Sequence, residues 1–287
     1  MKRKLSTAKC TLITAFLLLL LLTAACGAPA AAPPASPPAE QPADAEPAGD
    51  SGEPDGPSAL PEKLIVATNA EFPPFEFITE QGGGALGEYD GVDIMLVQAL
   101  AAELGLEVEI SNMDFDAIIP AIVSGKANIG IAGMTVTEER LTNVDFSVPY
   151  WVAVQSIIVP SGSDIAGVDD LQGKKVGIIT GFTGDIALSA IGGIDLQHYK
   201  KGVDAVMDLN NGRIDAVVID SPTAHKLIAG FADLSAIDDD PAFELESYAI
   251  CVAKGNEEFV AKINEALQKL IDDGAIEAFA AEVDARL

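Results

Sequence analysis

One pattern occurs twice in the chain and limits what it can fold into. The segments FDAIIPAIVSGKANIGIAGMT (115–135) and VDAVMDLNNGRIDAVVIDSPT (203–223) each combine an apolar helical pattern, a glycine followed by a cation, and a short apolar strand. A helix that returns the chain to a new strand is the building unit of parallel sheets. Two copies predict an α/β fold with two similar lobes. Two ordinary helix–strand units with similar turns are the alternative interpretation.

The repeated segments also indicate where a ligand would bind. Aligning Gly125–Lys126 with Gly212–Arg213 places Gly133 opposite Asp220, each just beyond the carboxyl end of a strand. Ligands of open α/β sheets bind outside these strand ends. We therefore expect a ligand site between the two lobes.

The rest of the folded part, residues 62–287, continues the alternation of strands and helices. A helix is expected from Val92 to Leu104 because apolar residues recur on one face and Gly105 ends the pattern. Further strands are predicted at 63–69, 152–160, 173–181 and 246–254, and a long helix broken near Gly274 is predicted at 256–279.

Residues 1–25 have the features of a lipoprotein signal peptide. A basic start precedes the apolar run TLITAFLLLLLL (11–22), which ends in LTAAC. In this interpretation Cys26 becomes the first mature residue and carries lipid. Thr23 departs from the usual pattern, which has leucine there, and an ordinary signal peptide cleaved elsewhere is the alternative.

Residues 26–61 are predicted to be a disordered linker. Ten of the chain's 17 prolines lie there, with many alanines and no lysine or arginine. Such a segment cannot bury enough apolar surface to fold. The whole chain has 44 acidic and 17 basic residues, a net charge of −27. This charge argues against nucleic acid and anionic lipid surfaces as partners.

Cysteine and histidine usage excludes several kinds of chemistry. Of the three cysteines only Cys251 lies in the folded part, so no disulfide is expected there, and its neighbours predict a buried strand thiol. His198 and His225 are the only histidines, and each is expected on an exposed helix or loop. We expect no metal, no cofactor and no catalytic triad.

The first lobe offers two segments suited to a ligand site. Asn69 ends a predicted strand, and Phe72 precedes two prolines that hold its ring near the strand end. Farther along, Gly133 and Met134 are expected to expose backbone N–H groups beside the Thr135 hydroxyl. Arg140 follows one turn into a short helix, where its planar guanidinium matches a carboxylate.

The second lobe offers an anion site and an acid. The loop before Thr183 and Gly184 opens a helix whose N–H groups attract an anion. Asp220 ends an apolar strand, either as a cap for the next turn or as a counter-charge for an ammonium group. A carboxylate site opposite an ammonium site complements the zwitterion of an α-amino acid.

The chain resembles the solute-binding proteins of polar amino acid ABC transporters. The motifs are ATNAEFPPFEF, YDGVDIMLVQALAAELGL, MDFDAIIPAIVSGKANIGIAGMTVTEERLTNVDFSVPYW, LQGKKVGIITGFTGD and NGRIDAVVIDSP. The resemblance implies a two-lobed, type II periplasmic-binding-protein-like fold that closes over one amino acid. It also implies domain bounds: lobe 1 at 62–149 and 249–287, lobe 2 at 155–243, and hinges at 150–154 and 244–248.

The same resemblance assigns roles to residues of lobe 1. Phe72 corresponds to the residue that stacks on the ligand side chain, and Phe115 to the opposite wall in some members. Gly133 and Thr135 correspond to carboxylate or amine contacts. Arg140 corresponds to the residue that binds the ligand carboxylate.

In lobe 2 the resemblance makes Thr183 a carboxylate contact and Asp220 the amine acceptor. Two positions depart from the family pattern. Asn69 replaces an aspartate common in members that bind cationic side chains, which favours a neutral polar ligand. Phe182 fills a position often held by a small residue, where it would either narrow the pocket or turn outward.

These features predict a monomeric binding protein, not an enzyme, that delivers an L-amino acid to a transporter permease. It would be anchored by lipid to the membrane on the extracytoplasmic side. A receptor that presents the amino acid to a signalling partner and a dehydratase-like enzyme on the same scaffold are the alternatives.

Overall fold

The computed structural model describes residues 60–79, 82–238 and 240–287, which lie within one compact unit of the chain, Pro54–Leu287. The predicted signal peptide, Cys26 and all but the last two residues of the predicted linker lie outside the described residues.

The elements alternate between strands and helices along the chain. In order they are β1 (Lys63–Thr68), β2 (Glu71–Phe72), β3 (Glu76–Ile78), β4 (Tyr89–Asp90), α1 (Val92–Leu104), β5 (Glu107–Asn112), α2 (Phe115–Val123), β6 (Ile129–Gly130), α3 (Glu138–Leu141), β7 (Val144–Phe146), β8 (Trp151–Ala153), β9 (Gln155–Pro160), η1 (Val168–Leu171), β10 (Lys175–Ile179), α4 (Thr183–Ile191), β11 (Asp195–Tyr199), α5 (Gly202–Asn210), β12 (Ala216–Asp220), α6 (Ser221–Ile228), β13 (Leu234–Ile237), β14 (Glu246–Tyr248), β15 (Cys251–Ala253), α7 (Glu257–Asp272) and α8 (Ala275–Asp284).

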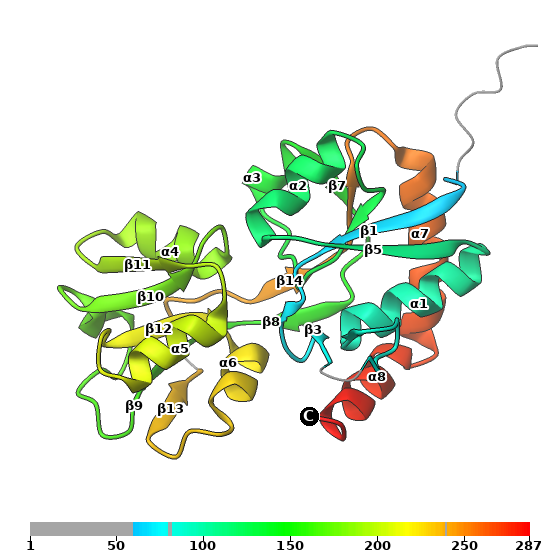
Figure 1. Ribbon diagram of the computed structural model, residues 1–287. Coiled ribbons are helices and arrows are strands. Elements are labelled where there is room, and N and C mark those ends of the chain that lie inside the picture. Colours follow the sequence, from blue (N-terminus) through cyan, green and yellow to red (C-terminus); the bar gives the residue numbers. More distant parts are fainter. Residues whose placement is uncertain (1–59, 80–81, 239) are drawn as a thin grey trace, which may run out of the picture. The chain divides into compact units, whose positions relative to one another are not determined.

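Two five-stranded sheets organise the described residues (Figure 1). The sheet of the first lobe has the order β5-β1-β6-β15-β7, and the sheet of the second lobe has the order β11-β10-β12-β9-β13. In each sheet one strand, β15 in the first and β9 in the second, runs antiparallel to the other four. This arrangement confirms the predicted two-lobed α/β fold.

The repeated sequence pattern occupies equivalent places in the two sheets. In the first lobe α2 leads into β6, and in the second lobe α5 leads into β12, each strand being the third in its sheet. Both helices pack on the strands of their own sheet. The shared pattern therefore reflects a shared architecture, and it brings the loops after β6 and β12 to corresponding strand ends.

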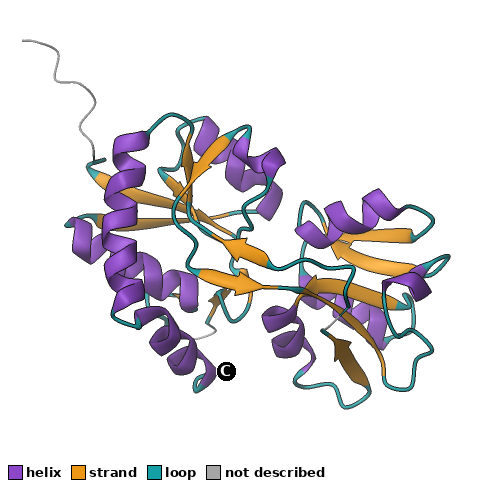
Figure 2. Ribbon diagram, turned by 180° about the vertical axis from the view of Figure 1, so that it is seen from behind, coloured by secondary structure: helices purple, strands orange, loops and turns teal. Residues whose placement is uncertain are grey.

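Helices cover the sheets because their apolar faces need burial (Figure 2). In α1, Val92, Leu96 and Leu100 are fully buried, and the left-handed Gly105 ends the helix as predicted. The C-terminal helical pattern is broken at Gly274, which lies between α7 and α8. Both of these helices pack on α1.

Two predicted strands are each split in the structure. Residues 152–160 form parts of β8 and β9, and residues 246–254 form β14 and β15. The predictions of single strands were wrong because each chain segment leaves one sheet and joins another. Strands β8 and β14 pair with each other, Glu246 opposite Ala153 and Tyr248 opposite Trp151, and form the connection between the two main sheets. An unbroken apolar run does not reveal such a change of partner.

Two smaller predictions have different outcomes. Cys251 is a fully buried strand thiol, as predicted, and burial raises its pKa to about 12. His198 is exposed but lies on strand β11, so its placement on a helix or loop was wrong. Among the residues that the structure describes, strand β11 pairs with β10 alone. Such an edge strand tolerates a polar sequence, so its composition did not indicate a strand.

Candidate functional site

Six of the predicted site residues surround one small cavity of about 10 Å³. They come from α2, the loop after β6, α3, the start of α4 and the end of β12, and they are Phe115, Gly133, Thr135, Arg140, Thr183 and Asp220, with Phe182 as the seventh lining residue. A volume of this size holds at most about one water molecule. Binding of an amino acid therefore requires the lining side chains or the lobes to move.

Arg140 is held at this cavity by its short helix. The Thr137 hydroxyl accepts a hydrogen bond from the Arg140 backbone N–H and caps α3, which confirms the predicted helix start. The guanidinium is buried and donates to the carbonyl oxygens of Thr135 (2.6 Å) and Gly181 (3.0 Å), so it contacts both lobes. It also lies over the Phe115 ring, 5.2 Å from the centroid.

The charge of Arg140 is balanced by two nearby acids, Glu246 and Asp220. Burial lowers the pKa of the guanidinium, whereas the nearby carboxylates of Glu246 and Asp220 raise it. Arginine stays protonated under such conditions. A buried cation with fixed N–H donors is thus available for an anionic group.

Asp220 provides a buried anion. It precedes α6, but its side chain makes no capping hydrogen bond there, and it accepts a 2.5 Å hydrogen bond from the Tyr248 hydroxyl. Burial, together with the negative charge of Glu246, raises the pKa of Asp220 to about 7. An ammonium group placed beside Asp220 would relieve both effects.

Glu246 was missed in the sequence although it binds two of the residues that line the cavity, Thr135 and Thr183. Its carboxylate accepts hydrogen bonds from the hydroxyls of Thr135 (2.6 Å) and Thr183 (2.7 Å) and from Gln155 Nε2 (3.0 Å). The signal that was available is the alternation in the sequence Glu246-Ser247-Tyr248. Residues two apart on a strand share a face, so an acid and a tyrosine point the same way.

The loop carrying Gly133 is fixed from behind by a buried acid. The Gly133 N–H donates to Asp93 Oδ2 (2.9 Å), and the Tyr150 hydroxyl donates to the same oxygen (2.8 Å). Burial raises the pKa of Asp93 to about 6. The Gly133 N–H, expected to be exposed, is therefore already paired. Gly133 has φ +52°, and a Cβ there would come within 2.6 Å of the Phe72 ring.

Three aromatic rings pack together beside the charged groups. Phe182 turns inward and makes edge contacts with Phe72 (centroids 5.3 Å apart) and Phe115 (4.5 Å). The two rings expected to flank a ligand side chain thus flank Phe182 instead. A ligand side chain at this place has to displace the Phe182 ring, and it would meet an aromatic surface without a charge.

Four predicted residues do not line this cavity. Asn69 is buried, and its amide donates to the Met113 carbonyl oxygen (2.8 Å). Met134 is part of the hydrophobic core, and Phe72 packs behind Gly133. Gly184 lies against Gln155, since a Cβ at Gly184 would be 2.7 Å from Gln155 Oε1.

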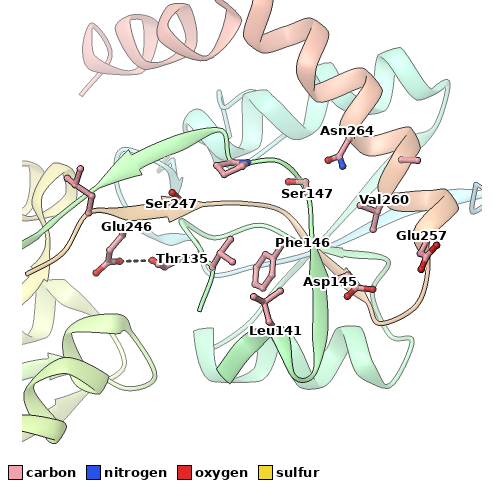
Figure 3. A pocket seen from close by; sticks show the side chains of 14 residues that line it. Thr135, Leu141, Asp145, Phe146, Ser147, Glu246, Ser247, Glu257, Val260 and Asn264 are labelled. Carbon is pink, nitrogen blue, oxygen red and sulfur yellow. Dashed lines mark hydrogen bonds between the residues drawn. The ribbon is translucent and has the colours of Figure 1, made fainter. Parts of the chain in front are cut away.

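A larger groove of about 860 Å³ lies next to the site (Figure 3). It runs between the hinge strand β14 and helix α7, which contributes Val260 and Asn264, and Thr135 and Glu246 stand at one end. The charged groups of the candidate site do not converge on the rest of this groove. We therefore place the candidate site at the smaller cavity, where a buried cation and a buried anion face the same space.

Within the ranges that the structure covers, no helix is long and apolar enough to cross a membrane. Over those same ranges, no three histidine, cysteine or acidic side chains are grouped so as to hold a metal ion.

Comparison with known proteins shows the family to which the chain is related. Residues 64–282 match the family described as bacterial extracellular solute-binding proteins, family 3. A probable histidine-binding protein of Neisseria gonorrhoeae is 34% identical over 227 residues, which cover 76% of this chain and 82% of that protein. The L-cystine-binding protein TcyJ of Escherichia coli (strain K12) is 30% identical over 218 residues, or 75% and 80% of the two chains.

The fold agrees with the sequence match. The solved structure of an ancestral arginine-binding protein bound to glutamine superimposes with a TM-score of 0.72 and 40% sequence identity, covering 78% of this chain and 98% of that one. The chain belongs to the bacterial extracellular solute-binding proteins, family 3.

Proposed function

We propose that this protein binds one L-amino acid with a neutral polar side chain and delivers it to the permease of an ABC transporter. The observation that carries the proposal is that Arg140 and Asp220, a buried cation and a buried acid, line the same cavity. A buried guanidinium matches an α-carboxylate, and a buried carboxylate matches an α-ammonium group. Closing the lobes over the ligand would exclude water and strengthen both interactions.

The side-chain preference is proposed from the uncharged part of the site. The rings of Phe115 and Phe182 line the cavity, and Phe72 packs on Phe182. The family resemblance places Asn69 where an aspartate is common in members that bind cationic side chains. Proteins similar to this chain are described as binding histidine, cystine or arginine, and one solved relative holds glutamine. Glutamine is therefore the first neutral ligand to test, and arginine is its counterpart with a charged side chain.

Calorimetric titration of the purified protein tests the proposed function. The protein is unfolded and refolded first to remove bound ligand, and then titrated with the common L-amino acids. We expect a micromolar or lower Kd for a neutral polar amino acid, and weaker binding of arginine and lysine. Tighter binding of arginine would leave amino acid binding intact and contradict the neutral preference. Absence of binding to all of them would contradict the proposed function.

We also propose that Cys26 carries the lipid that holds the protein at the extracytoplasmic face of the membrane. The proposal rests on the basic start, the apolar run and the small residues before Cys26. Acyl chains bind membranes through buried CH₂ groups, so their loss should release the protein. We expect Cys26→Ser to move the protein from the membrane fraction to the soluble fraction in the producing bacterium. Cys10→Ser is the matched control and should stay in the membrane fraction. Retention of Cys26→Ser there would contradict the anchor.

A further inference from the structure

The hinge strand β14 carries two side chains that bind residues lining the amino acid site. Glu246 and Tyr248 are buried, and Tyr248 donates to Asp220. Glu246 reaches the hydroxyls of Thr135, from the first lobe, and Thr183, from the second lobe. Both distances, 2.6 and 2.7 Å, are to the same oxygen, Oε2. Figure 3 shows the contact between Glu246 and Thr135 as a dashed line.

These contacts fix the direction in which each hydroxyl donates. A threonine hydroxyl has one proton and two lone pairs, and an ionised carboxylate only accepts hydrogen bonds. Thr135 and Thr183 therefore both give their single proton to Glu246. The Thr183 oxygen also accepts from Gln155 Nε2 (3.1 Å), and Gln155 in turn donates to the other oxygen of Glu246. Only lone pairs of the two hydroxyl oxygens remain for a ligand.

A hydroxyl that can only accept a hydrogen bond suits an ammonium group and not a carboxylate. An ammonium group has three donors and no acceptor, while a carboxylate has acceptors only. The two hydroxyls lie on the same cavity as Asp220, which is also an anion. The local charge also favours an ammonium group, because the two carboxylates of Asp220 and Glu246 outnumber the one guanidinium of Arg140. The excess of negative charge favours an ammonium group on the side of the cavity where Asp220 lies.

We propose that Glu246 is a positioning residue that turns the Thr135 and Thr183 hydroxyls into acceptors and so makes the site specific for the ligand's α-ammonium group. This inference deepens the proposed function and rests on it. It also revises the expected role of Thr183, whose hydroxyl then serves the ammonium end, while Arg140 alone among the charged side chains of the cavity serves the carboxylate end.

The test compares two ligands that differ only in the ammonium group. The first probe is the common L-amino acid that binds most tightly, and the second is the same acid without its α-amino group (for glutamine, glutaramic acid). The Kd of the acid without its α-amino group, divided by the Kd of the amino acid, measures the selection for ammonium and is called the Kd ratio. Glu246→Gln keeps the shape of the side chain, but its amide N–H groups can donate to a threonine oxygen and release a hydroxyl proton toward the ligand.

We expect the full-length Glu246→Gln variant to lower the Kd ratio at least tenfold relative to the unmodified protein, mainly by weakening binding of the amino acid. Glu244→Gln removes the same charge from an exposed position two residues away and should leave the ratio unchanged. Glu246→Asp retains a carboxylate and should keep more of the selection than Glu246→Gln. A merely structural role would weaken both probes equally.

The outcomes separate this inference from the proposed function. If the unmodified protein binds no amino acid, the proposed function fails. If it binds one and Glu246→Gln leaves the Kd ratio unchanged, or weakens both probes by the same factor, only the role of Glu246 is overturned. If Glu246→Gln does not fold, Thr135→Val and Thr183→Val test the same point, since each removes one acceptor. An unchanged Kd ratio in both would overturn the inference.

Discussion

Arg140→Ala is expected to weaken amino acid binding at least about a hundredfold, which corresponds to about 2.7 kcal/mol. Removing one partner of a buried, hydrogen-bonded charge pair costs about 2–5 kcal/mol, because the other charge is left unpaired. The guanidinium is buried at the cavity and already spans the two lobes through Gly181. Its loss therefore removes both a ligand contact and a contact that closes the site. Isothermal titration calorimetry measures the change in Kd.

Two further variants make this result specific. Arg140→Lys keeps the charge but not the planar pair of donors, so we expect affinity between those of the unmodified protein and Arg140→Ala. Arg213→Ala removes an exposed arginine that pairs with Asp208, and should leave Kd unchanged. Circular dichroism and thermal unfolding should show that Arg140→Ala still folds. A folded Arg140→Ala with unchanged affinity would show that another group binds the carboxylate.

Asp220→Asn is expected to have opposite effects on binding and stability. Binding of the amino acid should be lost or reduced at least about a hundredfold, because the buried counter-charge of the ammonium group is gone. The folded protein without ligand should become more stable at pH 8, by about 1–2 kcal/mol, because the neutral amide avoids the cost of burying a carboxylate charge. Asparagine can still accept the hydrogen bond from Tyr248.

The pH dependence of this gain follows from the pKa of Asp220. Burial raises it from 3.8 to about 7 in the folded protein, and Glu246 contributes to the shift. Between those two pH values the folded protein holds a proton that the unfolded chain has lost, so stability falls as the pH rises through this range. The advantage of Asp220→Asn should therefore be largest above pH 7 and shrink as the pH falls toward 4. Denaturation by urea at pH 5 and pH 8 measures it.

Binding to the unmodified protein should show the complementary dependence. An ammonium group pairs with ionised Asp220, so affinity should fall below pH 7, by up to about tenfold per pH unit. The groups that act on Asp220 are Glu246, the Tyr248 hydroxyl, Gln155 and Arg140, together with the buried acid Glu76, whose pKa is raised in part by the charge of Asp220. Asp233→Asn, the same change at an exposed position of the same lobe, should alter neither binding nor stability. Affinity that is constant from pH 5 to pH 8 would argue against Asp220 as the ammonium partner.

The sequence indicates Arg140 and Asp220 as site residues more clearly than it indicates Glu246. Arg140 stands out because it is a single arginine inside a threonine-capped first turn, and Asp220 because an acid ends an apolar strand. Glu246 gives a weaker signal, because the alternation Glu246-Ser247-Tyr248 indicates only that the acid and the tyrosine share one face of a strand. Its importance comes from the position of β14, which pairs with β8 between the two main sheets and brings Glu246 into contact with threonines from both lobes.

The directions of the Phe182 and Asn69 side chains could not be predicted from the sequence. The sequence places Phe182 in the loop before α4 but leaves open whether the ring turns inward, and the structure packs it between Phe72 and Phe115. The sequence likewise makes Asn69 a candidate contact, whereas its amide is paired with Met113. The direction of a side chain depends on neighbours that are distant in the chain.

The sequence by itself determined the two-lobed α/β fold, the repeated helix–strand unit and the buried strand around Cys251. Periodicity and turn residues are local properties, and each is written within a few residues. The tertiary structure decided where strands change sheets, which acid meets the threonines and how large the cavity is. Those outcomes depend on packing between segments as far apart as Thr135 and Glu246, and no local pattern encodes such a contact.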